Sequence, residues 1–421
     1  GMENGMPAYR CTNRYDFTDL EELEIRYKIR TPSAVFLQGV LPVKCAPGET
    51  VSGTLAFTLP EFSFEEFFTE FSFHTKKDTV WAEAGYELGF AQLKLPVKQT
   101  VPETEPTSSM PPLTVTFSGE VQSGVLQAEG EDFVYRFDLD KGHFTSIVFN
   151  GIELLAAPTR FSVYRAPTDN DRNIRRAWNG SFLQLAKEKL YSCRVLEVNR
   201  KYVTLLASYS AAAPSFLPFV KYSVLWVICG SGEIGASVTA ELRPGAGMLP
   251  RFGLELAMPP GNEQLRYCGF GPGPAYCDMR HFCKKGIYDA SVTEEFTPYI
   301  FPQETGNHYG TEWAAVFDAE GRGLLFKGIQ EFEFSALHYT AEDLDTAQFA
   351  KDLQPRKETI VRIDYKQSGI GSNSCGPELL PQYRFDDPQF CYSFTIKPIF
   401  TENTDLLRES RTLPGITEET S

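Results

Sequence analysis

A nearly continuous β pattern between about residues 113 and 398 restricts the fold more than any other feature of the sequence. Residues 133–137 alternate apolar and polar side chains, as a half-buried strand does. Asn150-Gly151 predicts a two-residue hairpin turn, and Gly230-Ser231-Gly232 predicts another turn between two apolar runs. Only residues 177–190 have a helical composition. Because no second linker divides this stretch, we predict one large β-sandwich over residues 113–400.

A smaller β domain is predicted before this stretch. Residues 9–97 contain short strands separated by Pro/Gly turns, a spacing typical of immunoglobulin-like sandwiches. We therefore assign residues 1–97 to such a domain. Residues 98–112 contain four prolines among Thr, Ser and Glu, which predicts an extended linker. The polar residues 401–421 are expected to form a loose tail.

Composition excludes several classes of partner. The 421 residues include 40 Lys and Arg against 55 Asp and Glu, a formal net charge of −15. An acidic chain without a Lys/Arg run offers no surface for nucleic acid or for an anionic membrane. No run of about 18 apolar residues is present, so we expect no membrane span. The nine cysteines lack close spacing and are odd in number. This favours free, buried thiols and a cytoplasmic location.

A ten-residue segment, residues 368–377, carries Gly, Ser, Asn, Cys and Pro and has almost nothing to place in a core. Residues 360–365 before it alternate like a half-buried strand, and residues 383–385 after it return to a strand-like composition. Glycine permits a positive φ, and Ser and Asn side chains hydrogen-bond the local backbone. The segment is therefore predicted to be a shaped loop on a β scaffold, either a binding loop or a long turn with a buried thiol.

Local residue patterns give weak support for catalytic or metal chemistry. Asp169, Asn170 and Asp171 offer oxygen ligands, but the rest of an EF-type calcium spacing is absent. Cys277, His281 and Cys283 lack the paired spacing that zinc requires. Cys375 has no local nucleophile signature. Glu304 has no alternating βα units around it that would build a catalytic barrel. We expect neither a metal nor a cofactor.

Together the motifs resemble one family, the large bacterial β-galactosidases of glycoside hydrolase family 2. YRAPTDND at 164–171 is similar to their RAP-x-DND signature. Further similar stretches follow in the same order along the chain: G-x-GP-x-x-x-Y-x-D at 269–278, TPY-x-FP-x-E-x-G at 297–306, and the late Gly-rich loop at 369–377. Residues 15–18 (YDFT) and 81–85 (WAEAG) resemble the immunoglobulin-like domain that precedes these motifs. The matches cover almost the entire chain.

The resemblance implies an all-β architecture, an immunoglobulin-like β-sandwich followed by a galactose-mutarotase-like supersandwich. It also implies that the catalytic barrel with both catalytic glutamates lies outside this chain, so the double-displacement reaction does not run on it alone. A catalytic barrel domain or large subunit is the implied partner, and a β-galactoside or galactose the implied ligand. The implied pocket edge is Asn373, Ser374 and Cys375. Implied pocket or interface residues are Arg165, Asp169, Asn170, Asp171, Tyr276, Asp278, Glu304, Asn307 and His308.

Two departures from the family pattern concern the ligand. Well-known members place a sugar-stacking Trp where this chain has Cys375, so stacking is not expected here. Residues 273–277 read GPAYC, where relatives often carry Glu, Asn and Pro around the Tyr. Two other functions stay open: a free-standing carbohydrate-binding module, and a mutarotase-like sugar epimerase that would use His308 with Glu304 as an acid–base pair. The sequence also leaves self-association into a homo-oligomer open.

Overall fold

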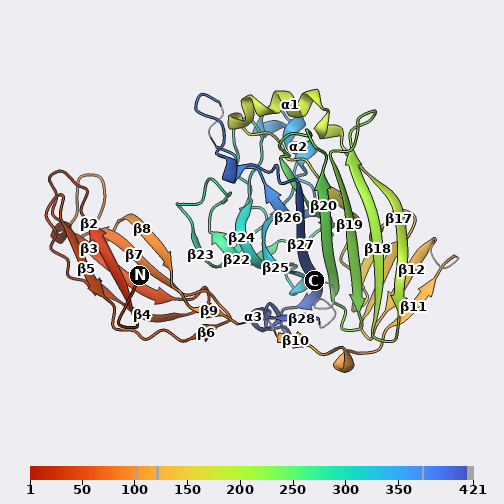
Figure 1. The fold of residues 1–421 in the computed structure, drawn as a ribbon, viewed down its shortest axis with the longest axis horizontal. Helices are drawn as coiled ribbons and strands as arrows, with labels where there is room; N and C mark the ends of the chain where they lie inside the picture. Colours follow the sequence, from red (N-terminus) through yellow and green to blue (C-terminus); the bar gives the residue numbers. More distant parts are fainter. Residues whose placement is uncertain (101–102, 120–122, 372–373, 415–421) are drawn as a thin grey trace. The chain divides into compact units, whose positions relative to one another are not determined.

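The computed structural model describes residues 1–100, 103–119, 123–371 and 374–414 of the chain. It divides into two compact units. Unit 1 comprises Gly1–Pro102 with Lys285–Ile287, and unit 2 comprises Glu103–Lys284 with Tyr288–Ser421. Strands dominate both units (Figure 1). Among the described residues, no helix is both long enough and apolar enough to cross a membrane.

Unit 1 is a small β-sandwich. In one sheet β3 pairs with β4 and β7, and β7 with β8; in the other layer β2 pairs with β5. Ile25, Ile29 and Phe71 lie in the core between the layers, where Tyr9 packs on Phe71. This is the predicted immunoglobulin-like sandwich. Its elements are β1 (Met2–Glu3), β2 (Met6–Thr12), η1 (Leu20–Glu22), β3 (Leu23–Arg30), β4 (Val35–Leu41), β5 (Thr50–Thr54), β6 (Phe62–Ser63), β7 (Phe68–Thr75), β8 (Glu87–Lys94) and β9 (Lys98–Gln99).

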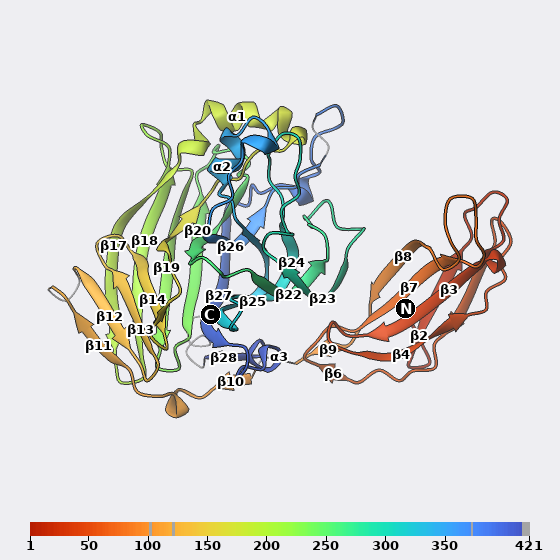
Figure 2. The same cartoon turned by 180° about the vertical axis from the view of Figure 1, so that it is seen from behind.

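Unit 2 contains a large curved sheet packed on a smaller one (Figures 1 and 2). Within the described residues the large sheet has 12 strands, with the path β16-β21-β26-β25-β27-β20-β19-β18-β17, and the small sheet runs β11 to β15 in chain order. Their bounds are β11 (Thr114–Phe117), β12 (Val125–Glu129), β13 (Phe133–Asp138), β14 (His143–Phe149), β15 (Ile152–Glu153), β16 (Ala157–Ser162), β17 (Lys187–Val198), β18 (Tyr202–Ala212), β19 (Val220–Cys229), β20 (Ile234–Leu242), β21 (Arg251–Met258), β22 (Gln264–Gly271), β23 (Lys284–Ser291), β24 (His308–Phe317), β25 (Arg322–Leu337), β26 (Thr359–Gln367) and β27 (Gln389–Phe400).

The core of unit 2 lies between these two sheets. Phe137 and Phe144 of the small sheet meet Trp226 of the large sheet, with ring centroids 6.3 and 5.2 Å away. This confirms the predicted supersandwich. The remaining elements are short: β10 (Glu103–Glu105), η2 (Thr107–Ser109), η3 (Asp169–Arg172), α1 (Ile174–Gly180), η4 (Leu183–Leu185), α2 (Ala341–Thr346), η5 (Ala350–Asp352), η6 (Pro381–Tyr383), α3 (Leu406–Glu409) and β28 (Thr412–Pro414).

The local predictions had mixed outcomes. Asn150 and Gly151 have φ values of 47° and 78° and join β14 to β15, so this hairpin is confirmed. The turn between β19 and β20 is confirmed as well. The helix predicted over residues 177–190 is confirmed only over residues 177–180. The helix α1 ends at Gly180, and residues from Lys187 pair with β18, because sheet pairing outweighs the local helical propensity.

The two polar segments at the domain boundary and near the C-terminus contain ordered elements. The predicted linker, residues 98–112, includes β9, β10 and η2. In the segment expected as a loose tail, residues 401–414 include α3 and β28, and β28 pairs in parallel with β10. Edge pairing satisfies the backbone of this polar stretch, which its composition does not reveal. Residues 415–421 lie outside the described part.

Candidate functional site

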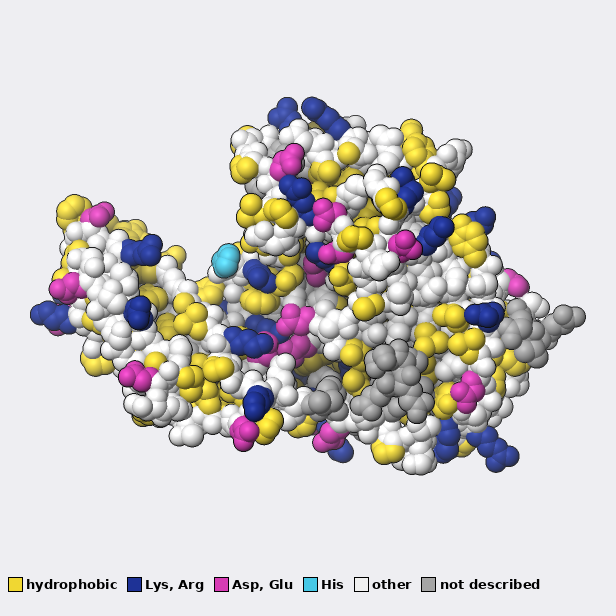
Figure 3. All heavy atoms as spheres, in the orientation of Figure 1, with side chains coloured by type: hydrophobic (Ala, Val, Ile, Leu, Met, Phe, Trp, Pro, Cys, Tyr) yellow, Lys and Arg dark blue, Asp and Glu magenta, His cyan; other side chains and the backbone are white. Residues whose placement is uncertain are grey.

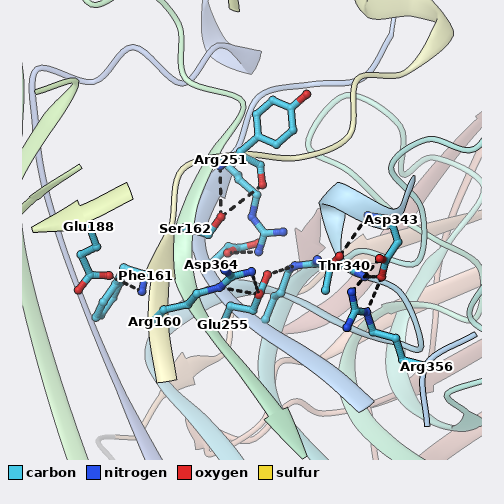
Figure 4. A network of polar contacts seen from close by, with 12 residues as sticks. Arg160, Phe161, Ser162, Glu188, Arg251, Glu255, Thr340, Asp343, Arg356 and Asp364 are labelled. Carbon is cyan, nitrogen blue, oxygen red and sulfur yellow. Dashed lines mark hydrogen bonds and ion pairs between the residues drawn. The ribbon is translucent and has the colours of Figure 1, made fainter. Parts of the chain in front are cut away.

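The strands beside the 368–377 loop bury charged residues on the face opposite the hydrophobic core. On β21, Leu254 packs in the core, whereas Arg251 lies on the other face of the strand. Arg251 Nη2 donates to Asp364 Oδ1 of β26 at 2.6 Å, and both side chains are fully buried. Arg362 Nε donates to Glu255 Oε2 at 3.0 Å (Figure 4 shows Glu255 beside Arg251 and Asp364). Buried charges require such partners, so this face is a polar layer rather than a solvent surface.

Burial of this face corrects one expectation. Residues 360–365 alternate as a half-buried strand would, but residues 359–364 are buried on both faces of β26. The polar positions of the alternation pair with other charges instead of with water. Burial alone would raise the pKa of Glu255, but Arg362, Arg160 and Arg251 lower it to about 2. Burial raises the pKa of Asp364 to about 6 despite Arg251. Both carboxylates are therefore ionised at neutral pH.

The base of the loop, residues 368–371, is held through its backbone. Arg165 Nη2 donates to the carbonyl oxygens of Ser368 and Gly369 at 3.4 and 3.3 Å. The Asp278 carboxylate accepts from the N–H groups of Ile370 and Gly371 at 3.0 and 2.7 Å. These side chains come from distant segments of the chain, and both lie in motifs singled out in the sequence. They fix the same short backbone from two sides.

Arg165 is itself fixed by the motif that carries it. Its Nη1 and Nη2 donate to the two carboxylate oxygens of Asp171 at 2.8 and 3.2 Å, with both residues buried. Thr168 closes the same turn, since its N–H donates to Asp171 and its hydroxyl donates to Ile370 O at 3.4 Å. Burial alone would lower the pKa of Arg165, but Asp171 and Glu304 raise it above its ordinary value. The guanidinium therefore stays charged. Trp178 of α1 lies 5.4 Å from it.

Steric crowding by Asp278 explains why residues 369 and 371 of the loop base are glycines. A Cβ at Gly369 would lie 2.6 Å from Asp278 Cγ, and a Cβ at Gly371 would lie 2.9 Å from Asp278 Oδ2. Side chains at these positions would displace the carboxylate that binds the loop. The two glycines thus allow the close approach of Asp278 to the backbone.

A second buried group supports the residue just before the loop. Glu333 of β25 accepts from Gln367 N at 3.0 Å and from Asn307 Nδ2 at 2.7 Å. Asn307 Nδ2 also donates to Ala275 O at 2.9 Å, and Gln367 Nε2 donates to Asn307 Oδ1 at 2.9 Å. Burial raises the pKa of Glu333 to about 8. Asn307 therefore ties the segment before Tyr276 to the end of β26.

The other predicted residues have separate surroundings. Asn170 Oδ1 accepts from Ser374 Oγ at 3.2 Å. Asp169 N donates to Gln303 Oε1 at 2.7 Å. Tyr276 and Glu304 are buried, and Glu304 N donates to Ala166 O at 3.3 Å. Asn373 lies outside the described residues. Cys375 is exposed.

The proposed His308–Glu304 acid–base pair is not formed. His308 Nε2 lies 2.8 Å from Glu295 Oε2, and its ring stacks on Tyr267 at 3.9 Å between centroids. The side chains of His308 and Glu304 are both buried, so neither reaches solvent in this structure. The prediction chose Glu304 because it lies near His308 in the sequence. The fold instead brings Glu295 to His308.

Several residues of this layer were missed by the sequence reasoning, namely Arg251, Asp364, Glu333 and Gln367. Three of them occupy strands in which polar residues alternate with apolar ones, and such positions read as solvent-facing. The arginine and carboxylate in residues 360–365 were a signal, since a motif loop follows them directly. Their buried pairing required knowledge of the neighbouring strand.

A cavity of about 320 Å³ adjoins the loop base, within the size range of small-molecule sites. Its lining combines aliphatic side chains with charged side chains of both signs. Arg384 Nη2 lies 3.3 Å from Glu378 Oε2 at this rim. The lining residues are Asp171, Asn173, Ile174, Ala177, Met248, Gly371, Glu378, Leu379, Arg384 and Asp386.

Comparison with known proteins gives consistent matches over both units. Residues 129–396 match the family model "Beta galactosidase small chain", and residues 9–96 match "Beta-galactosidase, domain 4". A β-galactosidase of Actinobacillus pleuropneumoniae is 30% identical over 388 residues, which cover 91% of this chain and 37% of that enzyme. A β-galactosidase of Priestia megaterium is 29% identical over 405 residues, covering 93% of this chain and 37% of the relative. The chain thus spans just over a third of these relatives' length.

Solved structures of lower similarity were also found. Galactose 1-epimerase from Lactobacillus acidophilus has a TM-score of 0.34 and 7% identity, covering 69% of this chain and 99% of that one. An aldose epimerase homologue from C. elegans has a TM-score of 0.35 and 8% identity, covering 66% and 99%. The sequence matches carry the assignment, since one family model covers more than half of the chain. The chain belongs to the β-galactosidase small-chain family.

Proposed function

We propose that this chain is a non-catalytic portion of a β-galactosidase of glycoside hydrolase family 2, as a small subunit or as the C-terminal part. It completes the galactoside site of a catalytic domain that this chain lacks. The observation that carries the proposal is the clamp on the loop base, in which Arg165 and Asp278 fix residues 368–371. A binding loop gains affinity and precision when its backbone is fixed before the ligand arrives.

The buried carboxylates near the loop support a non-catalytic role. A retaining glycosidase needs two carboxyl groups about 5–5.5 Å apart that both reach the sugar. Glu304 and Glu333 are 2% and 3% exposed, and Asp171 is engaged by Arg165. Asp171 and Glu333 accept hydrogen bonds from the residues around the loop. The chemistry is supplied by the catalytic domain.

The loop tip, residues 374–377, is the part that would meet the galactoside. Ser374 offers a hydroxyl and Cys375 an exposed thiol, and Asn373 precedes them in sequence. Hydroxyl and amide groups suit the hydrogen-bonding groups of a sugar, whereas a thiol gives contact without aromatic stacking. The tip would therefore form a polar, non-stacking wall. All nine cysteines are free, which supports a reducing, cytoplasmic location.

A second candidate function, a carbohydrate-binding module, is favoured by the 320 Å³ cavity beside the loop base. Its mixture of aliphatic and charged lining residues would suit a polyhydroxylated ligand. Calorimetry with galactose and lactose separates the two roles. Saturable heat from the isolated chain, lost in Arg384→Ala, would favour the binding module.

Assay of a chromogenic galactoside tests the main proposal. The chain is assayed alone, and then with the A. pleuropneumoniae relative truncated to lack the segment that aligns with this chain. We expect no turnover from the chain alone and restored turnover in the mixture. In the restored enzyme, Cys375→Ala should change KM for galactosides more than kcat. Turnover by the isolated chain would overturn the proposal. If Cys375→Ala leaves KM unchanged for several galactosides, the loop tip does not line the galactoside pocket.

A further inference from the structure

Unit 1 displays a group of exposed apolar side chains on two loops and at the start of β8, which we call the loop-end patch. Phe17 is 95% exposed and Trp81 is 62% exposed. Single exposed apolar residues are ordinary, but a group that includes four aromatic residues, one of them a Trp, marks an interaction surface. Figure 3 shows apolar side chains at the surface of unit 1 among charges of both signs. The patch consists of Tyr15, Phe17, Val80, Trp81, Tyr86 and Leu88.

Both loops leave the same end of the unit 1 sandwich. In the antiparallel pairing of β3 with β7, Leu23 lies opposite Thr75, and in the pairing of β7 with β8, His74 lies opposite Glu87. The loop before β3 and the loop between β7 and β8 therefore emerge together. Lys76 Nζ of one loop donates to Glu21 O beside the other at 2.5 Å. The patch residues therefore lie at one end of unit 1.

Hydrogen bonds of one buried side chain fix the loop before β3. Asn13 is 1% exposed, and its Nδ2 donates to Thr18 O and Cys45 O, each at 2.8 Å. Its Oδ1 accepts from Tyr15 N at 2.9 Å. These bonds hold the turn that carries Phe17. An aromatic ring on a fixed turn loses little conformational freedom on binding.

The loop between β7 and β8 is shaped in the same way. Asp78 Oδ1 accepts from Ala84 N at 2.8 Å, and Thr79 Oγ1 donates to Ala82 O at 2.9 Å. The rings of Trp81 and Tyr86 meet edge to face with centroids 5.7 Å apart. This loop also presents its aromatic residues in a fixed arrangement.

A cavity of about 340 Å³ opens beside the patch. Tyr15 and Leu88 belong both to the patch and to the cavity wall. Fixed aromatic residues next to a recess that can receive a partner side chain are the arrangement found at interface hot spots.

We infer that the loop-end patch docks unit 1 onto the part of a β-galactosidase that this chain lacks. The inference rests on the proposed function. The patch lies within residues 9–96, which match the β-galactosidase domain model, and the relatives are much longer than their matched 37%. Its neighbours Arg14, Lys77 and Glu83 mix both signs of charge, which suits a protein surface rather than a nucleic acid or an anionic membrane.

Binding of patch variants to the truncated A. pleuropneumoniae relative tests the inference. We expect Trp81→Ala to weaken binding by about 30-fold or more, and Phe17→Ser to weaken it further. Phe62→Ala is the matched control, because Phe62 is a 52% exposed ring of the same unit outside the patch. It should bind as the unmodified chain does. A chimera in which this chain replaces the aligned segment of the relative gives a second measurement, and Trp81→Ala should lower its thermal stability.

Each other outcome overturns the inference in a distinguishable way. If Trp81→Ala binds as tightly as the unmodified chain, the patch is not the docking surface, but the proposed function still holds. No binding and no restored turnover by the unmodified chain remove both. A homodimer in ultracentrifugation that Trp81→Ala dissociates would assign the patch to a second copy of this chain. A lower unfolding temperature of the isolated Trp81→Ala chain would assign it to packing within the chain.

Discussion

The base and the tip of the 368–377 loop are held in different ways. At the base, Ser368 and Gly369 are buried and receive hydrogen bonds from Arg165, and the next two N–H groups donate to Asp278. In the described part of the tip, Ser374 contacts Asn170, and residues 375–377 are exposed. The buried Arg165 and the half-buried Asp278 therefore fix the base, and the tip faces solvent.

The difference separates two kinds of motif residue. Arg165, Asp171 and Asp278 act on backbone atoms and set where the loop begins. Ser374 instead contacts the Asn170 side chain, and Cys375 is exposed. A family motif in this chain thus marks the support of a site more often than the surface of the site. Changes at the base should affect stability first, whereas changes at the tip should affect binding.

Arg165→Ala should give the largest effect. It leaves the Asp171 carboxylate buried without its partner, which should lower the free energy of unfolding by about 3–5 kcal/mol. Denaturant unfolding followed by fluorescence measures this loss. Arg172→Ala changes an exposed arginine of the same turn and should stay within about 0.5 kcal/mol of the unmodified chain. Similar losses in both variants would show that the buried pair does not anchor the loop.

The raised pKa of Glu333 should make the free energy of unfolding depend on pH. Burial raises the pKa of this carboxyl from 4.5 to about 8, so its contribution is fully present below pH 4.5 and is lost as the pH rises through 8. Between pH 6 and pH 9 this amounts to a loss of about 2–3 kcal/mol. Glu333→Gln should flatten the stability profile over that range. A profile of equal slope in the variant would contradict the role assigned to burial.

Asp278→Asn should weaken the base by a smaller amount. The amide keeps one acceptor oxygen but loses the charge-assisted bonds to two N–H groups, at a cost of about 1.5–3 kcal/mol. Urea midpoints measure the change. Asp169→Asn is the control, since Asp169 is an exposed carboxylate of another motif. If both variants unfold at the same midpoint, Asp278 is not a clamp.

Ser374→Ala should have the smallest effect on stability, within about 0.5 kcal/mol, because the contact with Asn170 is exposed.

Thiol labelling compares the exposure of the loop tip with that of a buried cysteine. Cys375 should react with a maleimide in the folded chain, whereas Cys277 is buried and its thiol pKa is raised mainly by burial. Slow labelling of Cys375, measured by peptide mass spectrometry, would mean that the tip is covered.

Much of the fold could be read from local patterns. The Asn150-Gly151 turn and the boundary near residue 102 follow from short-range rules of turn and linker chemistry. The helix predicted for residues 177–190 failed beyond Gly180 because β18 supplies a partner strand that no local rule contains. The ordering of residues 401–414 depends in the same way on β10.

The site was less predictable than the fold. The sequence marked Arg165 and Asp278, but their targets are the backbone atoms of residues 368–371, which carry no side-chain signal. Glu333 lies in a long strand and has no motif of its own. The pairing of His308 with Glu295 depends on how the chain between them folds back. Polar residues of a buried layer can be assigned only when both partners are known.

Hydrogen exchange at individual amides of the loop tests the central claim most directly. The account predicts slow exchange at Ile370 and Gly371, whose N–H groups donate to Asp278, and fast exchange at residues 374–376. Asp278→Asn should speed exchange at the two base amides and leave the tip unchanged. Exchange at Ile370 and Gly371 as fast as at the tip in the unmodified chain would contradict the claim that charged side chains fix the base of this loop.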